Sequence, residues 1–290
     1  MKRQLNNHSC VQEVELSYTG ELFDDESQLL SQVHPNADIS QIALDGRRMN
    51  KPQLCQLVHV MLRGDPTRIK LRHNCFGATE MTALVRSIDR ANRRLTDLDL
   101  SDNRLRGQDS LALLKVIETS KTIKCLKLDS NMVGVRGAQR FTKLLRTNKT
   151  LLSVSLFTTK INDKGAVAIG QALAANSTLE LLMIGGNSIG PTGAQAIASS
   201  IELNTTLAYL DLQCNQLDNS GAVFLARMLQ SNKTLRTLDI CRSFIRSNGI
   251  VAIADSLTNN RTLLELFIDW SCSLKKRLWR LRASSPPTRR

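Results

Sequence analysis

Large apolar residues recur along this chain in a fixed pattern, L-x-x-L-x-L-x-x-N, where x is any residue. The pattern begins seven times with a constant period (123 − 95 = 28), at Leu95, Ile123, Leu151, Leu179, Leu207, Leu235 and Leu263. Within each copy the apolar residues alternate with polar ones, which predicts a short strand. Weaker copies start at Val11, Ile39 and Pro66. A period of this length is typical of a repeat protein, here with about ten units.

The second half of each unit has the apolar spacing of a helix. Glycines also recur with the same period, at Gly137, Gly165, Gly193, Gly221 and Gly249, and the first four precede Ala. The residues that follow, such as GAVAIGQALAAN, place apolar side chains on one helical face. The Gly-Ala pair is expected to open each helix, and its small side chains are expected to let neighbouring helices pack closely.

Asparagine ends most copies of the pattern, at Asn74, Asn103, Asn131, Asn187 and Asn215. Its amide can hydrogen-bond backbone groups that are otherwise unpaired where the strand turns, so stacked copies predict a ladder. Thr159 and Ser243 place a hydroxyl at this position, which partly replaces the amide. Each unit then closes with Asn-x-Thr, from Asn148 to Asn260. Because these five sequons follow the repeat period, we expect them to be unglycosylated.

The quoted residues resemble leucine-rich repeats of the ribonuclease-inhibitor class, and most closely the 28-residue arrays of NLRC-type NOD-like receptors. The resemblance implies an α/β fold, a right-handed leucine-rich-repeat solenoid (horseshoe) with a parallel sheet on the concave face and helices on the convex face. We expect an N-terminal flank over 1–10, the repeat array over 11–273 and a basic C-terminal segment over 274–290. The chain has no Gly-Lys dipeptide and therefore no P-loop of a nucleotide-binding receptor module.

Charge, hydropathy and cysteine content indicate the compartment in which the protein resides. The 290 residues include 39 Lys plus Arg and 26 Asp plus Glu, a net charge of +13. No apolar run is long enough to span a membrane, and no apolar signal region follows the start. The seven Cys include no CxxC pair, which favours a reducing compartment. We expect a cytoplasmic protein, with a nuclear location possible through the basic tail.

The C-terminal segment holds seven of the basic residues and no acid, which leaves 13 − 7 = +6 for the rest. Leu274, Leu278 and Leu281 have helical spacing, so the segment predicts a capping helix that shields the last unit. Nuclear targeting, or attraction to anionic lipid or RNA, is the alternative. The final SSPPTRR is expected to be disordered.

One motif resembles a catalytic site. Gly186 to Gly190 read GNSIG, which matches the G-x-S-x-G turn that carries the serine of α/β-hydrolases. Its residues also fill ordinary repeat positions, and all four His precede Ser188, whereas that hydrolase order requires a later one. We therefore expect no catalytic residues, and no metal or cofactor site is indicated.

Side chains between the buried strand residues are expected to face the concave surface. The candidates for partner binding are the basic Arg68, Lys70 and Arg72, the acidic Asp97 and Asp99, the apolar Leu152, Phe157, Leu181, Met183 and Tyr209, and, in the last units, Asp239, Arg242, Phe267 and Trp270. A contiguous apolar patch on an exposed sheet usually marks an interface. Aromatic and Met side chains within a charged rim are typical of interface cores.

The leading hypothesis is a non-enzymatic protein–protein interaction scaffold, monomeric, that binds an unknown protein on its concave face. A second hypothesis is a regulator of a small GTPase, because Ran GTPase-activating proteins contain the same class of repeat. Those proteins characteristically carry an acidic C-terminal segment, whereas this segment is basic. A third is nucleic-acid or anionic-membrane binding through the tail, with an affinity that falls steeply with salt.

Overall fold

A computed structural model describes residues 12–17, 39–46, 66–74, 76, 83–88, 94–268 and 278–280. Within them the strands are β1 (Gln12–Ser17), β2 (Ile39–Asp45), β3 (Arg68–Lys70), β4 (Asp97–Asp99), β5 (Cys125–Lys127), β6 (Ser153–Ser155), β7 (Leu181–Met183), β8 (Tyr209–Asp211), β9 (Thr237–Asp239), β10 (Glu265–Phe267) and β11 (Leu278–Arg280). The helices with assigned bounds are α4 (Gly107–Thr119), α5 (Gly134–Thr147), α6 (Asn162–Leu173), α7 (Pro191–Leu203), α8 (Asp218–Ser231) and α9 (Ser247–Leu257).

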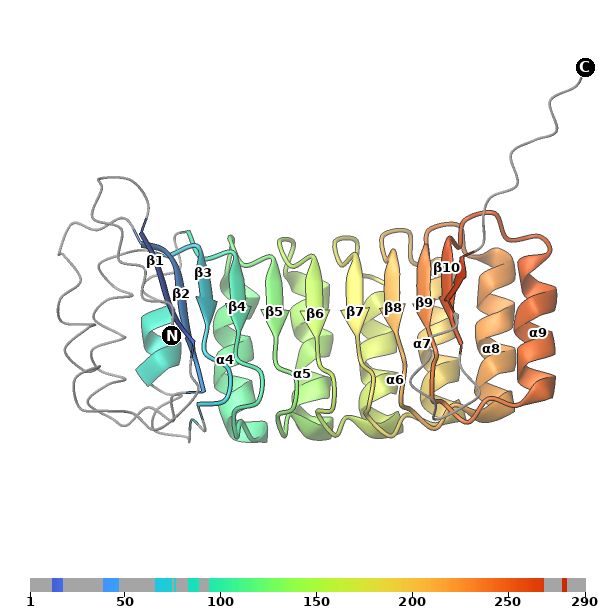
Figure 1. Cartoon of the computed structure of the whole chain (residues 1–290), viewed down its shortest axis with the longest axis horizontal. Helices are drawn as coiled ribbons and strands as arrows, with labels where there is room; N and C mark the ends of the chain where they lie inside the picture. Colours follow the sequence, from blue (N-terminus) through green and yellow to red (C-terminus); the bar gives the residue numbers. More distant parts are fainter. Residues whose placement is uncertain are drawn as a thin grey trace, which may run out of the picture.

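The strands form one sheet in sequence order, and the helices form a second layer behind it (Figure 1). Strands β1 to β10 are parallel, and their register follows the repeat, so that Leu98 pairs with Leu126 and Val154 with Leu182. Neighbouring strands lie about 4.8 Å apart, whereas packed helices need about 8–10 Å. The array therefore curves with the sheet on its concave side, and the predicted right-handed solenoid is confirmed.

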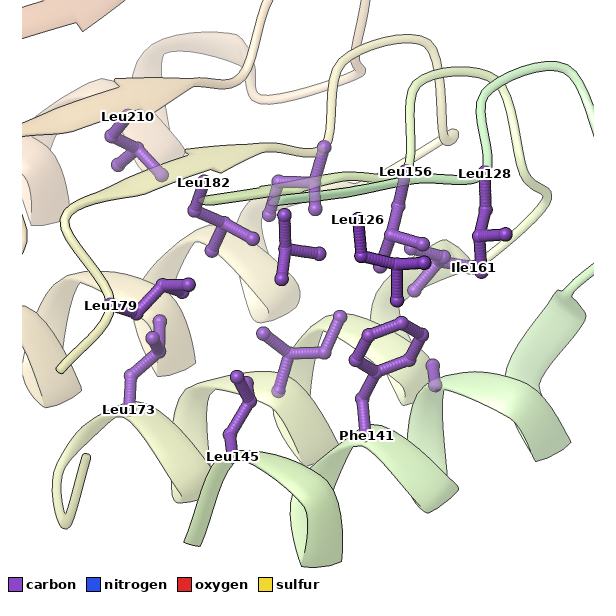
Figure 2. Packing of buried hydrophobic residues seen from close by; sticks show 14 of the residues in the cluster. Leu126, Leu128, Phe141, Leu145, Leu156, Ile161, Leu173, Leu179, Leu182 and Leu210 are labelled. Carbon is purple, nitrogen blue, oxygen red and sulfur yellow. The ribbon is translucent and has the colours of Figure 1, made fainter. Parts of the chain in front are cut away.

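The core lies between the two layers and runs the length of the array. Figure 2 shows strand leucines such as Leu126 and Leu182 directed toward Phe141, Leu145 and Leu173 on the helices. Phe141 is among the largest side chains that are fully buried. Each unit buries its apolar face only against its neighbours, which is why the repeat must stack to be stable.

Both sets of asparagines form ladders. The Asn103 side-chain nitrogen donates to the carbonyls of Leu71 and Leu100 at 2.8 and 2.9 Å, which confirms the predicted role of the first set. The closing asparagines form a second ladder on the helix side, where Asn204 donates to the Leu173 carbonyl at 2.8 Å. All five closing side chains are buried and engaged, so none offers its amide nitrogen for glycosylation.

The helices begin two or three residues before the Gly-Ala pair, so the prediction that this pair opens them was wrong. Helix α6 starts at Asn162, whose side chain accepts the Lys164 N–H at 3.0 Å and satisfies one of the unpaired donors of the first turn. The predicted close packing is confirmed. A Cβ at Gly193 would lie 2.9 Å from the Ala166 Cβ of the preceding helix, closer than two carbons approach.

The C-terminal segment differs from the prediction of a helix over 274–281. At Leu278–Arg280 the chain forms β11, which pairs antiparallel with β10. The last parallel strand exposes a row of unpaired backbone groups, and a returning strand satisfies them. This closure of the edge depends on a long-range pairing and not on local helical spacing. The rest of the segment, the flank over 1–10 and Trp270 lie outside the described residues.

In the described part of the chain, no helix is long and apolar enough to cross a membrane.

Candidate concave binding surface

The sheet presents a repeating set of side chains on its concave face. In each unit from β3 to β10 the middle strand residue is buried, and the first strand residue is exposed or half-buried. The third strand residue is half-buried as well, except in β6 and β8, where Ser155 and Asp211 are buried. Strand β7 illustrates this, because Leu181 and Met183 are half-buried whereas Leu182 is buried. Each surface position lies next to its counterpart one repeat away, so the face is a set of side-chain rows that cross the strands.

The predicted basic and acidic stripes lie side by side. Arg68 and Asp97 are register partners, as are Lys70 and Asp99, and the Arg68 Nε lies 3.8 Å from an Asp97 carboxylate oxygen. Arg72, two places after β3, is exposed. The Arg68–Asp97 pair is largely in solvent, so it contributes little to stability, about 0–1 kcal/mol. The two stripes therefore lie next to each other with opposite charges, and one ion pair joins them.

The predicted apolar residues largely come together. Leu181 and Tyr209 are register partners on adjacent strands, and Met183 lies between Ser155 and Asp211. The Phe157 ring covers Gly185, where a Cβ would be 2.6 Å from a ring atom. We call these four half-buried side chains, Phe157, Leu181, Met183 and Tyr209, the apolar patch. Leu152 precedes β6 and lies in the row of Lys124 and Glu180, at the margin of this patch.

Three carboxylates border the apolar patch toward the C-terminus, and we call Asp211, Asp239 and Glu265 the acidic border. Asp211 pairs in register with Met183 on one side and with Asp239 on the other. Burial, together with the charges of Asp211, Asp239 and Glu265, raises the pKa of Tyr209 to about 12. The phenol therefore stays neutral and able to donate a hydrogen bond throughout the physiological range.

Asp211 is the most buried member of the border, with 2% of its surface exposed. Burial is the main cause that raises the pKa of its carboxyl, and the charges of Asp239 and Asp129 add to it. Hydrogen bonds from the Gln213 backbone N–H (2.8 Å) and side-chain amide (2.9 Å) act in the opposite direction. Asp99 and Asp239 accept the equivalent hydrogen bond in their units, from the backbone N–H two residues later. These carboxylates therefore also stabilise the turn after the strand.

Asp211→Asn is expected to stabilise the protein at pH 7. A carboxyl whose folded pKa lies above its unfolded value gives greatest stability at low pH, and that stability is lost as pH rises through the folded pKa. The asparagine oxygen can still accept the Gln213 backbone N–H, and rotation of the Gln213 side-chain amide lets its oxygen accept from the new NH2 group, while the cost of burying a charge disappears. Thermal melts at pH 7, 5.5 and 4 test this, with the variant's advantage shrinking as pH falls. A variant less stable than the wild type at pH 7, or an advantage that is independent of pH, would contradict it.

The remaining candidates occupy the last units. Asp239 and Phe267 lie side by side as register partners on β9 and β10. Arg242 is exposed on the turn after β9, with a positive φ of 52°. Every described unit from His73 onward has a left-handed residue at that position, so the conformation belongs to the repeat.

The serine of the GNSIG motif shares its geometry with other repeats. Ser188 has φ 55°, while Lys160 and Phe244, at the same position one repeat before it and two repeats after it, have φ 61° and 58°. The same turn conformation thus recurs at repeat positions that hold Lys and Phe, so it does not mark a nucleophile. In the part of the chain that the structure describes, no group of three or more His, Cys, Asp or Glu could hold a metal ion.

Several concave residues were missed by sequence reasoning, which named only some members of each row. Lys127, Asp129, Asp211 and Glu265 occupy the same repeat positions as the predicted residues. The repeat offsets could have identified them. The burial of Asp211 could not be found this way, because it depends on the neighbouring side chains.

Comparison with known proteins supports the repeat. The family model described as Leucine Rich repeat matches residues 147–170, 175–198 and 203–226, whose starts follow the period of the chain (175 − 147 = 203 − 175 = 28). No curated protein matches the chain.

Two solved structures are similar at low identity. One is "Leiomodin-1 Actin-Binding Site 2 (ABS2)", at 23% identity and TM-score 0.43, covering 47% of this chain and 79% of that one. The other is "Crystal structure of Rad7 and Elc1 complex in yeast", at 11% identity and TM-score 0.37, covering 86% and 82%. At these TM-scores neither bears on function. The family model thus shows leucine-rich repeats within residues 147–226, and the 28-residue register and the two asparagine ladders continue the same pattern in the neighbouring units.

Proposed function

We propose that this protein is a non-enzymatic scaffold that binds a protein partner through the apolar patch and its acidic border. The observation that carries the proposal is the contiguity of Leu181, Tyr209 and Met183 in adjacent strands, with the Phe157 ring beside them. Exposed apolar area of this kind is costly in a monomer and usually marks an interface. Leucine-rich repeats are generally interaction scaffolds, which supports the same role.

The surface favours a partner of particular chemistry. The aromatic and Met side chains of the apolar patch supply an anchor for the partner. The three carboxylates of the acidic border favour a partner with cationic side chains at the margin of the patch. The backbone that holds these residues is a regular parallel sheet, so little ordering is needed on association. The likeness to ribonuclease-inhibitor-class and NLRC-type arrays, which rests on the 28-residue period, is consistent with recognition on this face.

Site-specific photocrosslinking tests the location. We expect a photoreactive residue at Met183 to give a defined crosslinked product with a binding protein. The matched position is Gln195 on α7, in the same unit but exposed on the opposite face. Equal crosslinking at both positions, or crosslinking only at Gln195, would place the partner elsewhere and reject the proposed surface.

A further inference from the structure

The positive charge of the array is concentrated in two adjacent units. Residues 104–164 contain 13 Lys plus Arg and four Asp plus Glu, a net charge of +9. The next stretch of similar length, 165–226, contains no Lys or Arg and four acids. Both stretches fold into the same strand and helix repeat, so the fold does not require the positive charge of residues 104–164. The difference lies in surface positions that the fold leaves free to vary.

The excess charge gathers on the convex face over α4, α5 and α6, which are consecutive helices behind the sheet (Figure 1). Exposed Lys and Arg side chains occupy equivalent positions in successive repeats, so they lie next to one another on neighbouring units. The pairs are Lys115 with Lys143, Lys121 with Lys149, and Arg136 with Lys164. Arg146 on the last turn of α5 is exposed as well. We call these seven residues the convex basic patch.

Little of this charge is neutralised internally. Glu118 accepts from Arg140 and, at 2.7 Å, from the Lys143 Nζ. Asp163 points its carboxylate at the Gly190 and Gly193 N–H groups, 2.7 and 2.8 Å away, and so caps the next helix. Arg136, Arg146 and Lys149 form no ion pair with any other described residue. The surplus therefore faces solvent, where it costs self-repulsion unless an anionic partner is bound.

We propose that the convex basic patch binds the phosphate backbone of a double-helical nucleic acid, independently of the concave surface. From Arg136 to Lys149 the patch extends about 20 Å along α5, and three helices make it about 20 Å wide. A duplex presents one phosphate charge per about 1.7 Å of its axis, so a length of about 20 Å carries about twelve phosphates, of which roughly half face one side. Seven cations on a rigid frame match that density.

The composition of the patch distinguishes a duplex from other polyanions. Binding of single strands normally uses aromatic side chains as stacking platforms, whereas the one aromatic residue of α4, α5 and α6, Phe141, is fully buried. Peripheral membrane binding uses apolar side chains that enter the lipid, and no large apolar side chain described on these three helices is fully exposed. Lys and Arg alone read charge and not base identity, so recognition here is independent of sequence.

Fluorescence anisotropy with the full chain tests the proposal, using labelled 20-base-pair DNA and RNA duplexes between 50 and 200 mM salt. We expect binding whose affinity falls with a log–log slope of about −5, the value for about six phosphate contacts. The triple variant R136Q/R146Q/K149Q is expected to bind about tenfold more weakly or worse, with a slope shallower by about three. Comparing the two duplexes separates DNA from RNA as the source of the phosphates.

A matched variant controls for overall charge. R227Q/K233Q/R261Q also removes three exposed cations, and Arg227 and Lys233 occupy the positions of Lys143 and Lys149 three repeats later. We expect it to change duplex affinity by no more than about twofold. An equal loss in both triple variants would overturn the proposal, because net charge would then account for the binding. Circular dichroism and thermal melts check that both variants fold.

Two further measurements distinguish the convex basic patch from the C-terminal segment, and a duplex from an anionic membrane. If K275Q/K276Q/R277Q abolishes duplex binding while R136Q/R146Q/K149Q retains it, the C-terminal segment is the binding element and the proposal fails. It also fails if vesicles of phosphatidylcholine mixed with phosphatidylserine bind through the patch while neither duplex does. Failure in any arm leaves the concave surface unaffected, since Phe157 and Tyr209 lie on the other face.

Discussion

Asn187→Ala is expected to lower the free energy of unfolding by about 3 kcal/mol, the cost of leaving several buried backbone groups unpaired. The Asn187 amide oxygen accepts the Thr159 and Ile161 N–H groups at 2.8 and 3.2 Å. Its nitrogen donates to the carbonyls of Leu156, Ile184 and Gly185 at 2.7 to 3.0 Å. One side chain thus connects two repeats, and it is 1% exposed, so water cannot readily replace it.

Because each repeat contacts only its neighbours, the damage is expected to be local. Hydrogen exchange is expected to accelerate first at the amides of β6, β7 and the turns after them, while chemical denaturation reports the overall loss. Asn187→Thr is expected to recover part of it, because Thr159 at the same position donates its hydroxyl to the Leu156 carbonyl at 2.7 Å. Gln195→Ala, on the exposed face of α7, is the control, with a change within about 0.5 kcal/mol. Equal losses in N187A and Q195A would show that the ladder does not hold the repeats together.

Much of the fold was predictable because the repeat is nearly strict. The offsets from Leu95 onward predict which strand residues are buried, and Leu98, Leu126 and Val154 are buried and in register. The Asn pattern predicts the ladder for the same reason. In a solenoid the neighbour in space is the residue one period away, so a local pattern already specifies long-range contacts.

One exception occurs where the period no longer specifies the neighbour. The strand at Leu278–Arg280 pairs with β10 by turning back along the sheet, which no 28-residue offset encodes. The start of α6 at Asn162 does follow the period, since α5 and α8 begin at the equivalent Gly134 and Asp218, and it was missed because the Gly-Ala pair lies inside the first turn. The returning strand is an end effect, in which unpaired backbone groups determine the structure.

The candidate site was predictable in position but not in environment. Alternation along the strands places Leu181, Met183 and Tyr209 on one face, as the sequence indicates. The sequence does not show that Arg68 and Asp97 offset each other, nor that Asp211 is almost wholly buried beside Asp239. These properties arise from side chains contributed by adjacent units. The convex basic patch likewise becomes visible only when rows from α4, α5 and α6 are placed together.

Phe157→Ala combined with Tyr209→Ala is expected to abolish partner binding, the largest functional effect that the structure implies. Aromatic anchors near the centre of an interface commonly contribute about 2 kcal/mol or more each, so losing both weakens binding by at least about a hundredfold. Both side chains are half-buried on the concave surface and outside the central core, so folding is expected to survive. Val223→Ala with Val251→Ala removes exposed apolar side chains from the convex helices α8 and α9 and is the control.

The most direct test of the concave binding surface compares these two double variants with the wild type. Affinity purification with quantitative mass spectrometry would identify the proteins recovered, and direct titration with the purified partner would then give the affinities. We expect at least one protein to be retained by the wild type and by V223A/V251A, and to be lost by F157A/Y209A while that variant melts within a few degrees of the wild type. Unchanged recovery and affinity with folded F157A/Y209A would contradict it.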